Sequence, residues 1–166
     1  MATSTQEIIR IIHKKNAAAF MRSSLFKEYY TQTVGECVVM PNAHQPSLEQ
    51  LRRFIDALVR RTGDHRLVLI LRDGRIAAHC TLITSPWNVW QVESVCVATA
   101  ARGQGLCKRL MEAAIAHVRG RRGRRVQVFC CPKNGAACAC YRSCFGPPVH
   151  VTRQTVAFEI DLTSTT

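Results

Sequence analysis

Two glycines, Gly103 and Gly105, stand one residue apart directly before a helical pattern, in the stretch ARGQGLCKRL. Glycine is a poor helix former, so a helix start is an unfavourable place for it. Without side chains there, the N–H groups of the loop and of the first helical turn can approach an anion. The stretch therefore predicts a phosphate-binding loop, with a plain strand-to-helix turn as the alternative.

Two well-known phosphate loops do not fit this stretch. A P-loop requires a lysine followed by Ser or Thr, and here Lys108 is followed by Arg109. The dinucleotide-binding fingerprint requires a third glycine at the position of Lys108. The stretch is therefore either a phosphate loop of another kind or a plain strand-to-helix turn.

A second segment, CCPKNGAACACYRSCFG, places Asn134, Ala137 and Tyr141 in the pattern N-x-x-A-x-x-x-Y, followed by Phe145. Together with VESVCVATAARGQGLCKRLM, it resembles the GCN5-related N-acetyltransferase (GNAT) superfamily over residues 67–146. The resemblance implies an enzyme that uses acetyl-CoA as co-substrate and an amine as acceptor.

The resemblance also implies where acetyl-CoA would lie. The strand before the loop would part from the strand at 126–131, and the pantetheine arm would lie in the gap. Its partners would be the backbone of Val95, Cys96 and Val97 and, on the cofactor-side helix, Asn134 and Ala137. The residues expected around the pyrophosphate are Arg102, Gly103, Gln104, Gly105, Leu106, Cys107 and Lys108. Cys107 and Cys144 depart from the family pattern, which has Gly or Ala at the first position and Gly at the second.

An amine attacks a thioester only when it is neutral, so a base must take its proton. Glu93 is our candidate because it alternates with Val95 and Val97, which predicts one shared strand face. Burial in so apolar a strand would make its carboxylate a stronger base. The alternative is an edge carboxylate paired with an arginine.

The leaving thiolate needs a proton, and the resemblance places the hydroxyl of Tyr141 by the sulfur as the acid. The alternative is a core tyrosine with a satisfied hydroxyl. His79 and His150 are secondary candidates for the base. The stretches VESVCV and CCPKN also resemble, more weakly, the glucosamine-phosphate N-acetyltransferases, although Ser94 departs from their pattern. The acceptor is therefore either a small phosphorylated amino sugar or a protein or peptide amine.

The formal net charge is +12, and Arg119–Arg125 holds five arginines in seven residues. Such a segment indicates either a nucleic-acid patch or nuclear import signal, or a solvated loop. A second function class therefore remains: a non-catalytic basic nucleic-acid-binding or regulatory protein on the same fold.

The elements needed to position these residues are readable in outline. Residues 66–72, 75–83 and 89–97 are predicted strands, the first two joined by a tight Asp73-Gly74 turn. Residues 6–12 fit a strand or a helix, and 31–46 a loop. The other expected elements are a helix at 17–30, one capped by Ser47 and Gln50, one from the glycines to about His117, a strand at 126–131, a helix at 135–144 and one or two strands in 151–162.

This order predicts one α/β domain over residues 1–166, with the GNAT fold: a mixed, mostly antiparallel sheet, helices on both faces and a splayed strand pair holding acetyl-CoA. Nine cysteines without an export signal predict reduced thiols in an intracellular, cytoplasmic protein, and their spacing fits no zinc site, so no metal is expected. Leu67–Leu71 is too short an apolar run for a membrane span. Edge strands would allow a homodimer as well as a monomer.

Overall fold

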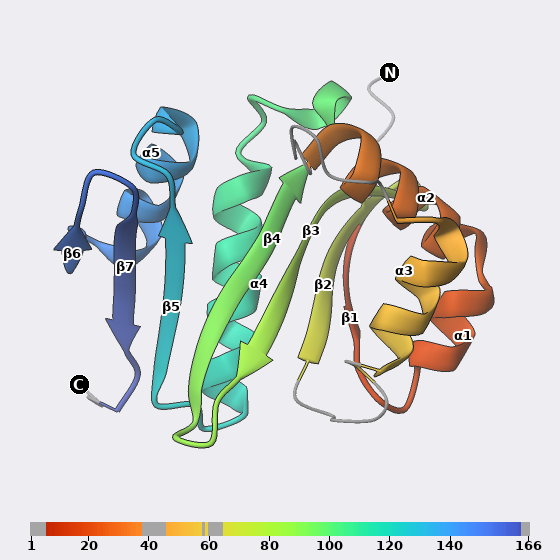
Figure 1. Cartoon of the computed structure of the whole chain (residues 1–166), viewed down its shortest axis with the longest axis horizontal. Helices are drawn as coiled ribbons and strands as arrows, with labels where there is room; N and C mark the ends of the chain where they lie inside the picture. Colours follow the sequence, from red (N-terminus) through yellow and green to blue (C-terminus); the bar gives the residue numbers. More distant parts are fainter. Residues whose placement is uncertain (1–5, 38–45, 58, 60–64, 164–166) are drawn as a thin grey trace.

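The computed structural model describes residues 6–37, 46–57, 59 and 65–163. The chain forms a seven-stranded sheet in the order β1-β2-β3-β4-β5-β7-β6 (Figure 1). Every neighbouring pair is antiparallel except β4 and β5, which run parallel, so the predicted mixed sheet is confirmed. The strands are β1 (Glu7–Ile12), β2 (His65–Arg72), β3 (Arg75–Thr84), β4 (Val89–Val97), β5 (Arg125–Cys130), β6 (His150–Val151) and β7 (Val156–Asp161).

Helices cover both faces of the sheet (Figure 1). In β2, Leu67 and Leu69 belong to the core under α1, α2 and α3, whereas Val68 and Ile70 belong to the core under α4 and α5. Two covered faces explain why this strand is aliphatic at every position from Leu67 to Leu71 rather than at alternate ones. The helices are α1 (Ala17–Arg22), α2 (Ser24–Gln32), α3 (Leu48–Ile55), α4 (Leu106–Gly120) and α5 (Gly135–Phe145), with short turns η1 (Thr33–Cys37) and η3 (Thr99–Ala101).

The predicted helix at 17–30 is wrong in one respect, because it is broken at Ser23. The backbone of Ser23 is extended, and its hydroxyl donates a hydrogen bond to the carbonyl of Phe20 at 2.6 Å. A serine side chain that bonds the preceding turn competes with helix continuation, so α1 ends and α2 begins in a new direction.

Three other sequence predictions are resolved by the described residues. The ambiguous segment at 6–12 is a strand, paired with β2. The predicted loop at 31–46 starts two residues too early, because α2 extends to Gln32. The π-helical turn η1 follows, and residues 38–45 lie outside the described residues. Helix α4 continues three residues beyond His117 to Gly120.

The predicted helix cap at Ser47 and the predicted tight turn at Asp73-Gly74 are both confirmed. Ser47 and Gln50 form a reciprocal capping box at the start of α3, with the Ser47 hydroxyl 3.2 Å from the Gln50 amide nitrogen. Asp73 and Gly74 join β2 to β3 with φ values of 49° and 78°. Both lie in the left-handed region that this tight turn requires.

Candidate active site

Strands β4 and β5 are paired only at their beginnings. The parallel register runs from Val89 opposite Arg125 to Val92 opposite Val128, and it ends there. Beyond this point β4 pairs only with β3, and β5 only with β7. The predicted splayed strand pair is therefore present at the end of the sheet where α4 begins.

A bulge in β4 marks the point where the strands part. Thr81 faces Glu93 across the ladder and His79 faces Cys96, so Ser94 and Val95 lie opposite the single residue Cys80. The extra residue is taken up at Ser94, whose φ is 51°. A bulge reverses the in-and-out alternation of a strand, so it redirects the side chains on either side of it.

Beside the splay lies a cavity of about 520 Å³, the β4–β5 cleft. Most of the residues expected to bind the cofactor line it. The expected residues in its wall are Val95, Cys96, Val97, Arg102, Gly103, Gly105, Leu106, Cys107, Asn134, Ala137 and Tyr141. The sequence analysis missed Glu36, Ala101 and Ala136, which also line it.

The two loop glycines are required by their backbone conformation. Gly103 and Gly105 have φ values of 74° and 73°, and open space surrounds the place where a Cβ would stand on each. Gly105 is the N-cap of α4, and no side chain accepts a hydrogen bond from the first turn of that helix. The free N–H groups and the positive end of the helix dipole form a surface suited to a phosphate.

Gln104 and Lys108 do not line the β4–β5 cleft, contrary to expectation. The side chain of Gln104 turns back to accept a hydrogen bond from Arg72. Lys108 lies on the exposed side of α4, 3.9 Å from the carboxylate of Glu112. Gln104 therefore holds the loop in place from behind.

The opposite wall of the cleft is α5. Asn134 is its N-cap, and its side-chain oxygen accepts a hydrogen bond from the backbone of Ala137 at 3.1 Å. The ring of Tyr141 is buried and packs edge-on against Phe158. Burial is the main reason that the pKa of Tyr141 is raised, and the thiol of Cys130 adds to it. The phenol therefore keeps its proton at neutral pH.

The hydroxyl of Tyr141 has no hydrogen-bond partner among the residues that the structure describes. It is consequently unlike a core tyrosine with a satisfied hydroxyl, which was the alternative. Its ring nevertheless belongs to the α4–α5 core.

The structure places Glu93 differently from the prediction. The bulge puts its side chain on the face of Thr81 and Cys96, rather than on that of Val95 and Val97. Glu93 is exposed, not buried, and its carboxylate accepts a hydrogen bond from Gln91 at 2.6 Å rather than pairing with an arginine. A prediction that assumes strict alternation along a strand cannot include a bulge, which explains why the predicted face of Glu93 is wrong.

Glu93 lines a separate cavity of about 200 Å³ under α2 and α3, here called the α3 cavity. Its wall is mostly apolar, and neither Lys nor Arg is among the described residues that line it. Glu93 and Ser94 reach it from the bulge, while Val95 reaches the β4–β5 cleft. The two cavities therefore meet β4 from opposite faces of the sheet. The residues lining the α3 cavity are Tyr29, Thr33, Leu51, Phe54, Ile55, Val59, His65, Leu67, Thr81, Ile83, Glu93 and Ser94.

Glu36 brings a second carboxylate to the end of β4. It accepts hydrogen bonds from the backbone and the hydroxyl of Thr99, at 2.7 and 2.9 Å. These bonds, the backbone one first, lower the pKa of the Glu36 carboxyl, so it is ionised at neutral pH. No local pattern marks Glu36 in the sequence, since the π-helical turn η1 carries it to the cleft.

The family model of the GNAT acetyltransferases matches residues 22–146, which is most of the chain. The chain belongs to the GNAT acetyltransferase family. No curated protein matches the sequence significantly.

Solved structures of GNAT proteins share the fold at low identity. An N-acetyltransferase from Staphylococcus aureus has a TM-score of 0.68 at 14% identity, with 95% of this chain and 99% of that chain covered. YncA from Salmonella typhimurium, solved with its cofactor acetyl-CoA, has a TM-score of 0.65 at 15% identity and coverages of 97% and 96%. PaiA N-acetyltransferase from Thermoplasma acidophilum, in complex with coenzyme A, has a TM-score of 0.66 at 10% identity and coverages of 94% and 99%.

The two departures from the GNAT pattern have different outcomes. Cys107 forms a disulfide with Cys140, which joins the first turn of α4 to α5 across the β4–β5 cleft. The prediction that the cysteines are reduced thiols is therefore wrong for this pair. Cys144 carries no disulfide, and its sulfur lies 4.0 Å from the carbonyl of Lys108. Both small residues leave the GNAT cleft open.

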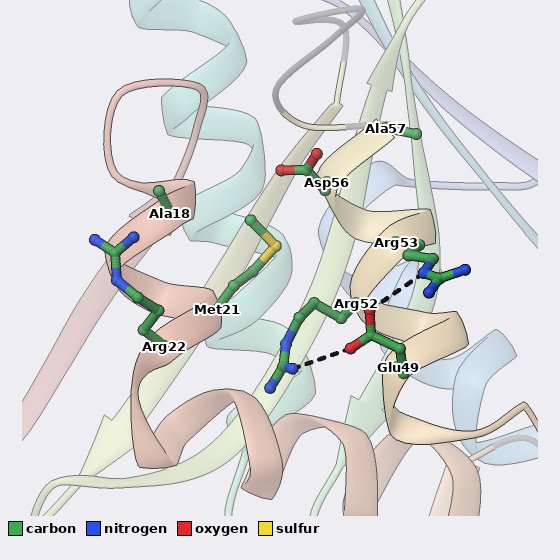
Figure 2. A pocket seen from close by; sticks show the side chains of 8 residues that line it. All are labelled: Ala18, Met21, Arg22, Glu49, Arg52, Arg53, Asp56 and Ala57. Carbon is green, nitrogen blue, oxygen red and sulfur yellow. Dashed lines mark hydrogen bonds and ion pairs between the residues drawn. The ribbon is translucent and has the colours of Figure 1, made fainter.

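A third cavity, of about 760 Å³, lies between α1 and α3 (Figure 2). Arg52 and Arg53 both pair with Glu49 in its wall, whereas the guanidinium of Arg22 on α1 points away from them. None of the residues singled out by the GNAT motifs lines it. Its size alone therefore does not make it the active site.

The described residues contain neither a candidate metal site nor a candidate membrane span. No group of three or more His, Cys, Asp or Glu side chains among them is arranged to hold a metal ion. No helix among them has the length and apolar character needed to cross a membrane.

Proposed function

We propose that this GNAT protein transfers the acetyl group of acetyl-CoA to a primary amine. The observation that carries the proposal is the β4–β5 cleft, where the open glycine loop, the parted strands and Tyr141 line one cavity. Family membership and the coenzyme seen in YncA and PaiA support it. Acetyl-CoA would supply an acetyl group activated as a thioester.

Each part of the cleft has a binding task in this proposal. The N–H groups at the start of α4, with Arg102 beside them, hold the pyrophosphate. Arg102 is oriented by a hydrogen bond from its side chain to the carbonyl of Val97 at 3.2 Å. The backbone of Val95 to Val97, which has no β5 partner, binds the pantetheine arm, and Asn134 borders it.

The chemical step needs a base on one side and an acid on the other. Glu93 takes the proton of the amine nitrogen, directly or through water, as that nitrogen bonds to the carbonyl carbon. Tyr141 donates its proton to the sulfur as the carbon–sulfur bond breaks. Its raised pKa keeps that proton available at neutral pH. The two residues lie on opposite faces of the sheet, so the acceptor and the thioester would meet at the bulge.

The α3 cavity is our candidate for the acceptor site. Its volume of about 200 Å³ suits a small molecule, and its described lining is mostly apolar, without Lys or Arg to bind a phosphate. Glu93, which is the one carboxylate among the described lining residues, would attract an ammonium group. A small amine with an apolar body therefore fits better than a phosphorylated amino sugar.

Calorimetric titration with acetyl-CoA tests the binding half of the proposal. Gly105→Trp places an indole in the open space of the loop, at a φ that disfavours a side chain, and should abolish binding. Gly120→Trp is the matched control, because Gly120 lies at the other end of α4 and also borders open space. Failure of the unsubstituted protein to bind acetyl-CoA would refute the proposal.

Steady-state kinetics on any acceptor found by screening amines tests the acid. Tyr141→Phe removes one hydroxyl and keeps the packing against Phe158, so we expect kcat to fall by about 100-fold while acetyl-CoA still binds. Glu93→Gln should lower kcat as well, and more strongly at low amine concentration. Unchanged turnover in Tyr141→Phe would remove the phenol from the mechanism.

A further inference from the structure

A strongly basic surface lies at the end of the sheet opposite the β4–β5 cleft. Helix α4 begins at the cleft, is fifteen residues long and ends in the arginine turn, residues 119–125 (Figure 1). A helix of that length spans about 22 Å, so the two ends do not overlap. The turn between β3 and β4, residues 85–88, lies at the same end (Figure 1).

The arginine turn is a fixed structure rather than a loose loop. The side chain of Asn88 donates a hydrogen bond to the carbonyl of Arg122 at 2.8 Å, and the backbone of Arg124 donates one to the carbonyl of Asn88 at 2.9 Å. Gly123 is buried, and a Cβ there would overlap Val118 and Trp90. The two turns therefore form one ordered unit, here called the basic end.

Three arginines of the basic end carry charge that no described acid pairs with. Arg119, Arg121 and Arg122 are exposed and have no ion-pair partner among the described residues. The margin of the basic end carries acids, since Glu159 pairs with Arg125 at 3.2 Å and Asp161 lies near Arg124. Guanidinium groups bind phosphates in planar, two-pronged contacts and stack on bases.

One large aromatic side chain stands out from the same surface. Trp87, next to Asn88 in the β3–β4 turn, is 78% exposed. An indole exposed to this extent costs hydrophobic free energy, and it is a platform on which an unpaired base can stack. The other tryptophan, Trp90, is 3% exposed and takes no part in the surface.

We propose that the basic end binds single-stranded nucleic acid, with Arg119, Arg121, Arg122 and Arg124 on the phosphates and Trp87 stacked on a base. The combination of a cationic groove and a stacking aromatic is the general solution for binding unpaired strands. An anionic membrane is a poorer fit, because membrane insertion requires a broad apolar face and Trp87 is the one large apolar side chain exposed on the two turns. The proposal does not rest on the acetyl-transfer activity.

Fluorescence anisotropy with labelled oligo-U and oligo-dT of about 12 nucleotides tests the proposal. The unsubstituted protein should bind both, with affinity falling as salt rises. Replacing the four arginines with alanine should weaken binding and reduce the salt slope by roughly 3, at about 0.7 for each lost phosphate contact. The matched control replaces four exposed basic residues elsewhere, Arg10, Arg22, Lys27 and Arg153, and should retain most of the affinity.

Two Trp87 variants separate base stacking from simple charge attraction. Trp87→Phe should retain most of the affinity, whereas Trp87→Ala should lose about tenfold. Strand binding should also quench the fluorescence of Trp87, while Trp90 is shielded. Acetyl-CoA binding should be unchanged in all these variants.

Several outcomes would overturn the proposal. They are absence of oligonucleotide binding at about 50 mM salt, equal losses in the arginine variant and its control, and no effect of Trp87→Ala. Preference for a duplex over the single strand would also contradict it. Binding to phosphatidylserine vesicles without binding to oligonucleotides would assign the surface to membranes instead.

Discussion

The imidazole of His79 is enclosed in the layer between β3 and α2, with no exposed surface. Tyr29 packs edge-on against it at 4.7 Å, and neither ring nitrogen has a hydrogen-bond partner among the described residues. Burial lowers the pKa of His79 to about 4, and the charge of Glu36 offsets only part of this. His79 is therefore neutral and inaccessible, which makes it unsuitable as the alternative base.

The lowered pKa of His79 makes stability depend on pH. Between pH 4 and 6.5 the imidazole of His79 is protonated in the unfolded chain but neutral in the folded chain. The free energy of unfolding therefore falls as the pH falls. The stabilisation is complete above pH 6.5 and lost below about 4. Its full size is about 3 kcal/mol, at about 1.4 kcal/mol per pH unit.

Urea denaturation across this pH range checks the prediction. His79→Leu replaces the imidazole with an apolar side chain of similar volume that cannot titrate, and should flatten the pH dependence between pH 4 and 6.5. His150→Leu is the control, because His150 is exposed and should leave the slope unchanged. The same slope in the protein and in His79→Leu would mean that other groups cause the acid sensitivity.

Residues that line the cleft could be predicted where a short sequence motif contains them. Gly103, Gly105 and Tyr141 stand in such motifs, whose spacing is visible in the sequence without knowledge of the fold. The role of Glu93 stays a prediction, and its predicted strand face is wrong because the bulge at Ser94 has no clear sequence signature. Glu36 depends on contacts between distant segments, and such contacts leave no local pattern.

At the scale of the elements, the Cys107–Cys140 disulfide joins α4 to α5 across the cleft. The cysteines are 33 residues apart, and a loop of this length implies stabilisation of about 4 kcal/mol through the unfolded state. We expect reduction, or Cys140→Ser, to lower the free energy of unfolding by up to that amount. Denaturant titration with and without dithiothreitol measures the change.

Cys144→Ser is the control for the disulfide, because Cys144 lies in the same helix without a disulfide. It should respond to dithiothreitol as the unsubstituted protein does, whereas Cys140→Ser should not respond. Equal stability of the reduced and oxidised protein would show that the bond does not stabilise the fold by constraining the unfolded chain.

Elements were predictable where the sequence marks their ends. Particular residues mark the end of β2 at the Asp73-Gly74 turn and the start of α3 at the Ser47 capping box. Both features lie where they were predicted. The break at Ser23 was missed, because a serine within a helical pattern usually points to solvent. β1 stayed ambiguous until its pairing with β2 decided it, since short apolar runs fit either state.

At the scale of the whole molecule, β1 is linked to the glycine loop by charge. Glu7 accepts a hydrogen bond from Arg72 at 3.0 Å and pairs with Arg109 of α4 at 2.7 Å. Arg72 also donates to Gln104 in the loop. The carboxylate of Glu7 is 13% exposed, so solvent screens this network less than it screens a surface ion pair. The first strand of the chain thereby fixes the position of a loop almost one hundred residues later.

This linkage predicts that a residue outside the cleft controls the affinity of the cleft. Glu7→Ala leaves Arg72 and Arg109 without their carboxylate, so Arg72 should hold Gln104 less firmly and the loop should lose its fixed form. We expect acetyl-CoA to bind roughly tenfold more weakly, since a hydrogen bond to a charged group contributes about 1.5 kcal/mol. Glu28→Ala is the control, because Glu28 pairs with Arg75 and not with the loop. Calorimetric titration of both variants with acetyl-CoA measures the change. Equal affinities for acetyl-CoA would mean that the loop keeps its form without β1. A loss of affinity in Glu7→Ala alone would show that the active form of the loop depends on the whole sheet.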